Sequence, residues 1–401
     1  MGKIDELIQQ YCPDGVEYVP IGDYLSYEQP TRYLVESTKY DDSYTTPVLT
    51  AGQSFILGYT KESSGIFDAS RNNPVIIFDD FTTSFHWVEF SFKVKSSAMK
   101  MLRPTNESKA LFRYLYHCMK NVQYVPGDHT RQWIGTYSQF EIPLPPLPVQ
   151  EAIVNILDRF AVYAAELQAE LQARQQQYNY YRDTLLSFEG RDDVQWKKLG
   201  ELCPLITKQT GFDYSNYIKD KLVREKKENH IPYIQTKFFT GRQFDFNTDY
   251  YIPEETAARF PKIVLDTKCI LLSIVGASIG NIGLYDNSQK SFLGGAIGVA
   301  KPSADVNTEF IYYYLTSHSG QKQIFHKVKG AGQATITIED IREFLVPQPS
   351  LSEQQRIVDI LDRFDTLVND LTQGLPAEIE ARQQQYEYYR DQLLTFKRKE
   401  A

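Results

Sequence analysis

The side chains of this sequence that could do chemistry form no pattern typical of an active site. The glycine-rich stretch SIVGASIGNIGLYD (273–286) fits neither GxGxxG nor GxxxxGK(S/T), so we interpret it as tight turns between strands. The stretch RNNPVI (71–76) is not the Asn/Asp-Pro-Pro-aromatic motif of amine methylation. Asp79 and Asp80 lack the further acid and the lysine of a nuclease, and they predict a turn or a helix start. The sequence therefore predicts a protein without catalytic residues.

The histidines and cysteines do not have the spacing of metal ligands. The six histidines show neither His-x-x-x-His nor Glu-flanked spacing, which favours solvated or core side chains. Cys12, Cys118, Cys203 and Cys269 are scattered singly, without a CxxC pair. We expect four buried thiols in a reducing cytosol and no metal site.

Composition and charge set broad limits. A chain of 401 residues with 42% hydrophobic residues predicts two or three globular domains. No apolar run has the length of a signal peptide or a membrane span. The net charge of −8 argues at first against nucleic acid, but residues 189–344 carry 20 basic and 19 acidic side chains. DNA binding therefore requires that the basic residues cluster.

One stretch of sixteen residues occurs twice with three differences. It reads ARQQQYNYYRDTLLSF at 173–188 and ARQQQYEYYRDQLLTF at 381–396. Upstream, IPLPPLPVQEAIVNILDRF (142–160) aligns with VPQPSLSEQQRIVDILDRF (346–364) at an offset of 204, whereas the closing stretches align at 208. The prolines predict an extended strap before each helix. We expect the first helix to start at Pro148 and the second to use a capping box of Ser352 and Gln355.

Steps of four and three residues select a stripe of apolar and aromatic residues in both copies, here called the seam. In the first copy the seam consists of Ile153, Leu157, Phe160, Leu167, Leu171, Tyr178, Tyr181, Leu185 and Phe188. In the second copy it consists of Ile357, Leu361, Phe364, Val368, Leu371, Leu375, Ile379, Tyr386, Tyr389, Leu393 and Phe396.

A stripe of this length predicts two long helices that pair antiparallel with each other. The alternative is that each helix packs on its own domain. The four extra residues of the second copy form a stutter, which keeps the seam facing its partner. Gly374 and Pro376 lie there and predict a kink or a short break.

The segments before the two helices also show weak similarity. GVEYVPIGDYL (15–25) aligns with DVQWKKLGELC (193–203), and LFRYLYH (111–117) resembles EFIYYYL (309–315). Between them the sequences differ, and residues 88–94 alternate as a half-buried strand. We predict an α+β fold in which two β-rich domains are separated by two long helices forming an antiparallel coiled coil, with a pseudo-twofold internal duplication. The predicted segments are residues 1–142 and 189–345 for the domains, 143–188 and 346–396 for the helical regions, and 397–401 for a tail.

Taken together, the straps, the repeated helices and the variable domains resemble the DNA-specificity subunit of type I restriction–modification systems. The resemblance covers essentially the whole chain, and the two helical segments are its most specific part. It implies that each domain is a target-recognition domain that reads one half of a split double-stranded DNA target, while the helices fix the spacer. It also implies no catalysis by this chain and no bound cofactor. S-adenosylmethionine and ATP would be used by partner subunits, namely two methyltransferase subunits and the restriction subunits, in a bacterial or archaeal cytoplasm and away from the membrane.

The resemblance turns basic and polar clusters into candidate DNA contacts, because Lys and Arg contact phosphates and Arg, Lys, Asn and Gln read base edges. In the first domain the candidates are Lys93, Lys95, Lys100, Arg103, His129, Arg131 and Gln132. In the second domain they are Lys219, Lys221, Arg224, Lys226, Lys227, Lys237, Arg242, Lys329 and Gln333. The run from Lys219 to Lys227 is the strongest of them as an electrostatic footprint.

Two other functions remain open from the residues alone. One is a DNA methyltransferase or nuclease with motifs that differ from the known ones. The other is a structural adaptor whose domains bind peptides and not DNA.

Overall fold

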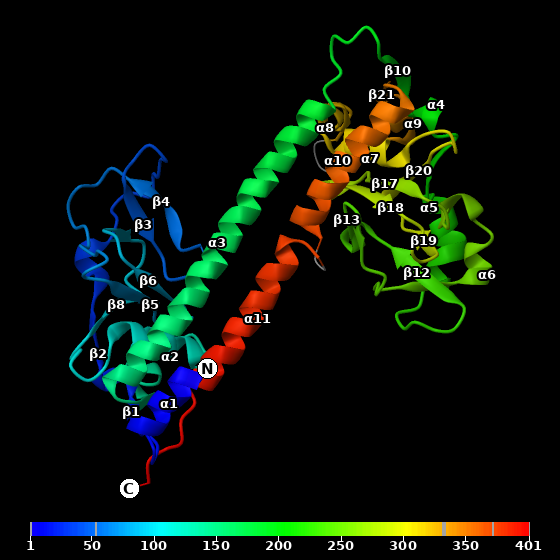
Figure 1. Cartoon of the computed structure of the whole chain (residues 1–401). Helices are drawn as coiled ribbons and strands as arrows, with labels where there is room; N and C mark the ends of the chain where they lie inside the picture. The colour runs from blue at the N-terminus through cyan, green and yellow to red at the C-terminus, as the bar shows by residue number, and fades with distance from the viewer. Residues whose placement is uncertain (1, 53, 331–333, 371–372, 401) are drawn as a thin grey trace. The chain divides into compact units, whose positions relative to one another are not determined.

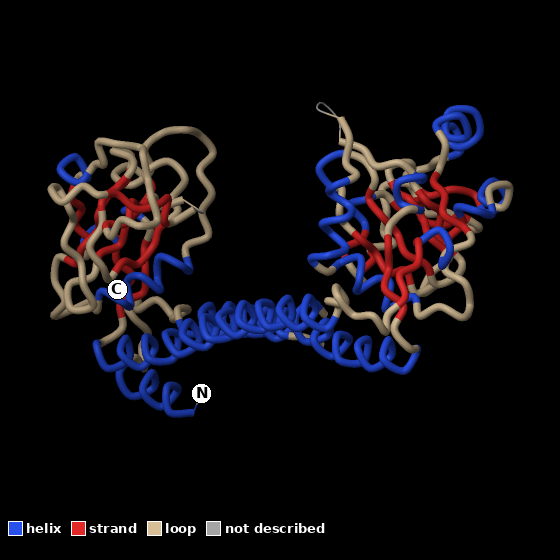
Figure 2. Tube along the Cα trace, turned by 90° about the horizontal axis from the view of Figure 1, so that it is seen from above, coloured by secondary structure: helices blue, strands red, loops and turns tan. Residues whose placement is uncertain are grey.

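The computed structural model describes residues 2–52, 54–330, 334–370 and 373–400, which fold into two compact units. The first unit consists of Met1–Gln168 and Glu378–Ala401, and the second of Ala169–Ala377. The strands of each unit gather in one globular group, and each unit also contains parts of the long helices (Figures 1 and 2). Among the residues that the structure describes, no helix combines the length and the apolar character needed to cross a membrane.

The first unit is built on a four-stranded antiparallel sheet in the order β2-β8-β5-β6. Its central strand β5 is buried on both faces. Ile76 and Phe78 pack into one apolar cluster, and Val75 and Ile77 into another, because successive side chains of a strand point to opposite faces. A second sheet has the order β4-β3-β7. The elements are α1 (Gly2–Tyr11), β1 (Glu17–Pro20), β2 (Leu25–Glu28), β3 (Thr46–Leu49), β4 (Ile56–Thr60), β5 (Val75–Asp79), β6 (Phe85–Val88), β7 (Lys93–Val94), β8 (Met99–Pro104), α2 (Phe112–Asn121) and β9 (Glu141–Leu144).

The second unit repeats this plan. Its sheet β11-β20-β17-β18 is also antiparallel, and its central strand β17 alternates Ile270 and Leu272 on one face with Cys269 and Leu271 on the other. A second sheet has the order β15-β12-β19-β16. The elements are β10 (Gln195–Lys198), α4 (Leu199–Leu202), β11 (Leu205–Lys208), α5 (Gly211–Asp213), β12 (His230–Ile234), β13 (Phe239–Thr240), β14 (Gln243–Phe244), β15 (Tyr251–Pro253), α6 (Glu254–Ala257), β16 (Val264–Leu265), β17 (Cys269–Ser273), β18 (Ile282–Tyr285), β19 (Ser291–Leu293), β20 (Ile297–Lys301), α7 (Thr308–Thr316), α8 (His318–His326), α9 (Ile338–Arg342) and β21 (Leu345–Gln348).

Both proline straps are strands that lead into a long helix. β9 pairs with β1, and β21 pairs with β10. Helix α3 (Leu147–Leu185) starts within one residue of the predicted position, and α10 covers Leu351–Asn369. The predicted capping box is wrong, because α10 starts before Ser352. Ser350 is the N-cap, and its hydroxyl accepts a hydrogen bond from the Glu353 amide at 3.3 Å.

The predicted break in the second copy is present. Helix α10 ends at Asn369, and α11 covers Leu375–Leu393. Gly374 packs so closely on the end of α10 that a Cβ at this position would lie 2.5 Å from the Thr366 carbonyl oxygen. A residue without a side chain is therefore required at position 374, where the chain leaves α10. Leu371 of the predicted seam lies outside the described residues.

The long helices pair in the same way in both units. In the first unit, the ring of Phe160 on α3 stacks on Tyr389 of α11 with centroids 5.5 Å apart. In the second, Tyr181 of α3 stacks on Phe364 of α10 at 5.4 Å. Phe160 corresponds to Phe364, and Tyr181 to Tyr389, in the repeat. Each copy therefore contributes the same two aromatic side chains to its partner, and the α+β fold with paired long helices is confirmed.

The seam is deeply buried only near the domains. Ile153, Leu157 and Leu393 belong to the core of the first unit, and Ile357 and Leu361 to that of the second, so both the pairing and the packing on a domain occur. Val368, Tyr178 and Phe188 are buried in the same core of the second unit. Further along, the seam residues Leu167, Leu171, Leu375 and Ile379 are half-buried. Arg174 pairs with Glu170 at 2.7 Å, and Arg382 pairs with Glu378 at 2.9 Å at the corresponding place.

The strand expected over residues 88–94 is interrupted. Val88 ends β6 in one sheet, and Val94 ends β7 in the other. Phe90 belongs to the segment that connects these two strands, and its side chain is exposed. The glycine-rich stretch is a turn as predicted, since Gly276 and Gly280 have φ of +76° and +94° between β17 and β18. All four cysteines are buried free thiols. After α11, Arg398 lies beside Val16, and its guanidinium pairs with Glu141 at 2.5 Å.

Candidate nucleic-acid interface

All five cations of the predicted basic run are exposed on the second unit. Lys219 and Lys221 belong to one 3-10 turn, and Arg224, Lys226 and Lys227 follow in the loop before β12. Within the part of the chain that the structure describes, none of the five forms an ion pair, whereas other lysines of this unit do. Residues 219–228 contain five basic and three acidic side chains, a net charge of +2. Exposed cations without internal partners are available to phosphates.

A hollow of about 610 Å³ opens beside this run, and Lys219 contributes to its lining. Gln209 also lines it and is only 3% exposed. Its Oε1 accepts a hydrogen bond from the Tyr233 hydroxyl at 2.9 Å, and its Nε2 donates to the Leu293 carbonyl at 3.2 Å. Burial raises the pKa of Tyr233 to about 12, so its hydroxyl remains a neutral donor. The Gln209 side chain is therefore fixed in position within the hollow.

Two lysines of the first domain face inward. Lys93 is buried, pairs with Glu62 at 3.0 Å, and donates to the Ser64 carbonyl at 2.8 Å. Lys100 pairs with Asp80 at 3.1 Å, and both side chains are 1% exposed. Their assignment as DNA contacts is therefore corrected, because an ammonium group that is buried against a carboxylate is not presented to a phosphate.

Asp80 connects the strand β5 to the loop that carries three other candidates. Its carboxylate accepts a hydrogen bond from the Trp133 amide at 2.8 Å, and its carbonyl accepts one from the Gln132 amide at 2.8 Å. The neighbouring ring of Phe81 stacks on His129 with centroids 4.6 Å apart. The buried Lys100–Asp80 pair thus positions the loop 127–133 against the end of β5.

The candidates on this loop differ in exposure. His129 and Arg131 are exposed, whereas Gln132 is buried. The Gln132 Oε1 accepts from the Tyr124 hydroxyl at 2.7 Å, and its Nε2 donates to the Thr130 carbonyl at 2.9 Å. His129 and Arg131 can contact a duplex directly, and Gln132 supports the loop from within.

Lys95 and Arg103 are the remaining basic candidates of the first domain. Lys95 is exposed just after β7. The Arg103 guanidinium lies over the Phe67 ring at 5.0 Å, and its Nη2 donates to the Asp68 carbonyl at 3.4 Å. Lys95 is thus the freer cation of the two.

Comparisons with known proteins agree with these observations. The family model described as the type I restriction modification DNA specificity domain matches residues 13–174 and 191–381. This chain belongs to that family. The type I restriction enzyme EcoR124I/EcoR124II specificity subunit of Escherichia coli is 43% identical over 397 residues, which cover 96% of this chain and 95% of the relative. A putative type I restriction enzyme specificity subunit of Haemophilus influenzae is 28% identical and covers 86% of each chain. The S subunit from M. genitalium has a similar fold, with a TM-score of 0.59 at 15% identity over 95% of this chain and 96% of that one.

The chain is therefore the DNA target specificity subunit of a type I restriction–modification complex, and it is not itself an enzyme. Asp79 fixes a turn, because its Oδ1 accepts hydrogen bonds from the amides of Phe81 and Thr82 at 2.9 and 2.8 Å.

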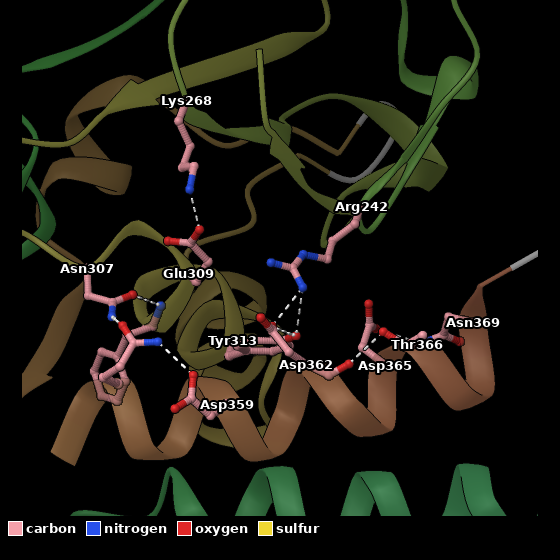
Figure 3. A network of polar contacts seen from close by, with 12 residues as sticks. Arg242, Lys268, Asn307, Glu309, Tyr313, Asp359, Asp362, Asp365, Thr366 and Asn369 are labelled. Carbon is pink, nitrogen blue, oxygen red and sulfur yellow. Dashed lines mark hydrogen bonds and ion pairs between the residues drawn. The ribbon is translucent and has the colours of Figure 1, made fainter. Parts of the chain in front are cut away.

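Arg242 of the specificity subunit is 31% exposed and contacts a helix. The turn between β13 and β14 places it against α10, where its Nη1 lies 2.7 Å from Asp362 Oδ1 and 3.3 Å from the Tyr313 hydroxyl (Figure 3). Tyr313 donates to the same carboxylate oxygen at 2.6 Å. The adjacent Gln243 donates to the carbonyl of Asn369, the last residue of α10. Arg242 therefore joins the second domain to α10, and its assignment as a DNA contact stays a prediction.

The first unit has a matching contact. Asp158 occupies the position of Asp362 in the repeat and accepts hydrogen bonds from Arg113 and His117 of α2, both at 2.8 Å. Burial opposes the charge of this carboxylate, yet these two hydrogen bonds lower the pKa of Asp158 below its ordinary value. The repeated aspartate thus connects each long helix to the domain that precedes it.

The remaining candidates of the second domain are engaged or lie outside the described residues. Lys237 pairs with Asp249 at 2.5 Å, and Lys329 pairs with Asp340 at 3.0 Å, both on the surface. Such exposed pairs are weak and can exchange for a phosphate. Gln333 lies outside the described residues.

Sequence reasoning missed the residues that position these surfaces. Asp80, Asp362 and Gln209 have long-range partners that no local pattern indicates. The one available signal was the aspartate shared by NILDRF (155–160) and DILDRF (359–364), which stands in both copies among the apolar seam residues.

The Lys100–Asp80 pair gives a prediction about stability. We expect Lys100→Met to lower the free energy of unfolding of the first unit by roughly 3–5 kcal/mol, because it leaves the Asp80 carboxylate buried without a counter-charge. Urea unfolding of the full chain would measure this. Lys95→Met is the matched control, since Lys95 is exposed in the same segment, and it should change stability by less than about 0.5 kcal/mol. The double variant Asp80→Asn/Lys100→Met should be less destabilised than the sum of the single variants; strict additivity would contradict the pairing.

Proposed function

We propose that the two β-rich domains each read one half of a split double-stranded DNA target, with the paired helices fixing the spacer between the halves. The proposed recognition domains are residues 1–142 and 189–345, joined by the helical regions 143–188 and 346–396. The observation that carries this proposal is the duplicated aromatic contact, Phe160 with Tyr389 and Phe364 with Tyr181. Helices paired in this reciprocal way provide a rigid element between two similar readers.

The contacts proposed for each half-site are chosen from the candidate residues whose side chains are exposed to solvent. In the second domain the run from Lys219 to Lys227 binds phosphates, and the adjacent hollow faces the bases. In the first domain His129 and Arg131 approach the bases, and Lys95 approaches the backbone. Phosphate contacts make binding salt-dependent, whereas contacts with base edges give specificity.

The same proposal covers the partners. This chain would hold two methyltransferase subunits that use S-adenosylmethionine to methylate adenine, and through them the restriction subunits that use ATP, all in the cytoplasm of a bacterium or archaeon. Support comes from the repeat itself, because two equivalent helical segments offer two equivalent docking places. One is the exposed Tyr180 of α3 and the other the exposed Tyr388 of α11, at corresponding positions.

Mapping methylated adenines genome-wide in cells with and without this chain tests the proposal. We expect loss of one bipartite motif, consisting of two short specified parts and a fixed unspecified spacer. Filter binding with random duplex DNA over a salt titration provides the physical test. Affinity that is absent or independent of salt would favour a peptide-binding adaptor, and methylation of DNA by the purified chain alone would favour an enzyme.

A further inference from the structure

The hollow beside Lys219 presents polar groups that the protein does not use. It is lined by Tyr214, Tyr250 and Gln235 in addition to Gln209 and Tyr233. Among the described residues, no hydrogen bond is made by the side-chain ends of Tyr214, Tyr250 or Gln235, although Gln209 and Tyr233 bond to each other. A recess that combines aromatic walls with several unused donors and acceptors is typical of a ligand site.

These groups suit a nucleobase. Tyrosine rings stack on the flat face of a base, and an amide such as that of Gln235 can pair with its donor and acceptor edge. Lys219 at the lining supplies a cation for the phosphate of the same nucleotide, and the basic run continues from it. A small apolar ligand would leave the amide and the hydroxyls unpaired, and an acidic peptide would make no use of the rings.

The shape of the site distinguishes between two ways of contacting DNA. Side chains that read a base inside the duplex must project into a groove. In this hollow of about 610 Å³ the fixed Gln209 is one of the lining residues and is 3% exposed, so its side chain lies below the protein surface. Only a base that has left the stack could reach it.

We propose that this hollow of the second domain receives an extrahelical nucleobase from the half-site that the domain reads. The proposal rests on the proposed DNA-reading function and adds a specificity element to it. Extrusion has a cost in unpairing and unstacking, which is smaller for a base that is already mismatched. The base is bound for recognition, because this chain carries no methyl-transfer residues.

A mismatch scan tests the proposal. The probe is a set of duplexes containing the target, each with one base pair of the second half-site replaced by a mismatch, and the protein is the full chain assembled with its methyltransferase subunits. We expect a mismatch at one position to tighten binding by about tenfold, because the unpairing cost is removed. Tyr214→Leu and Gln235→Leu should each reduce this gain to less than about twofold, because stacking or edge pairing is lost.

The controls separate the hollow from the methyltransferase and from folding. Tyr217→Leu changes an exposed tyrosine on the same helical turn outside the hollow and should retain the gain. Gln235→Leu complements Tyr214→Leu, because Tyr214 also packs against the core. A mismatch at the adenine that is methylated can also tighten binding, and this gain in affinity should persist in every variant. If no other position shows a gain, or if the gain is the same in Tyr214→Leu and Gln235→Leu, the inference is overturned while the proposed function stands. If the wild type does not bind its intact target, the inference about the hollow and the proposed DNA-reading function are both overturned.

Discussion

Deleting residues 371–374 is expected to produce a specificity subunit that directs methylation to a target with a spacer two base pairs shorter. The deletion removes the four residues by which the second copy exceeds the first. The first copy is the continuous helix α3, and four residues of helix span about 6 Å at 1.5 Å per residue, close to two base-pair steps of about 3.4 Å each. Methylation of the original target should fall by at least about a hundredfold, because one half-site loses several base contacts worth roughly 1–3 kcal/mol each. Methylome mapping in cells that express only the shortened chain would measure both effects.

The number four matters because of helix geometry. With 3.6 residues per turn, removing four residues rotates the following seam by only about 40° from a full turn, so α11 still presents Tyr386 and Tyr389 to Phe160 of α3. Removing two residues rotates the seam by roughly 200° and turns these side chains away. A two-residue deletion should therefore abolish methylation at every target. Replacing residues 371–373 with three alanines, with Gly374 kept, is the length-matched control and should leave the spacer unchanged.

An unchanged spacer in the four-residue deletion would contradict the view that this segment sets the distance. So would a change of spacer in the alanine replacement. Reduced methylation without any new motif would show that the shortened chain no longer brings two half-sites together, and the unfolding curve of the variant would then show whether α11 still docks.

The repeat, the break and the paired helices could be predicted because each depends on local sequence. Proline straps, a heptad stripe and a glycine beside a proline determine conformation within a few residues. The predicted N-cap of the second helix was wrong. Ser350 and Ser352 are both suitable capping residues, and the helix uses Ser350 because the proline strap ends earlier than the pattern suggested. Element boundaries are set by such small differences.

The roles of individual lysines could not be predicted, because they depend on residues that are distant in sequence. Lys93 and Lys95 would share a face if their strand continued, but β7 ends at Val94, so the first is buried and the second is exposed. Lys100 is neutralised by Asp80 only because β5 and β8 are neighbours. Arg242 is drawn to Asp362 across 120 positions of sequence. Composition identifies cations, whereas the fold decides which of them remain available.

The available cations give the second large prediction. Replacing Lys219, Lys221, Arg224, Lys226 and Lys227 together by glutamine should weaken DNA binding by about 10- to 100-fold near 0.15 M salt. It should also reduce the slope of log affinity against log salt by about 4–5, since each of the five lost phosphate contacts contributes roughly 0.9. The physical reason is that these five side chains have no internal partners among the described residues, so their charge is available to counter the phosphates. Filter binding of the target duplex over a salt series measures both quantities.

The matched control removes the same charge from the same unit. Arg191, Lys198, Lys268, Lys290 and Arg356 are partly exposed, but each is paired with a carboxylate, and none of them is a candidate DNA contact. Replacing these five by glutamine changes the net charge equally and sacrifices only surface pairs worth about 0–1 kcal/mol each. We expect affinity to fall less than about threefold and the salt slope to change by less than 1, because few of these cations contact phosphate. If the two sets of substitutions weakened binding equally, net charge alone would govern association, and the run from Lys219 to Lys227 would not be the contact surface.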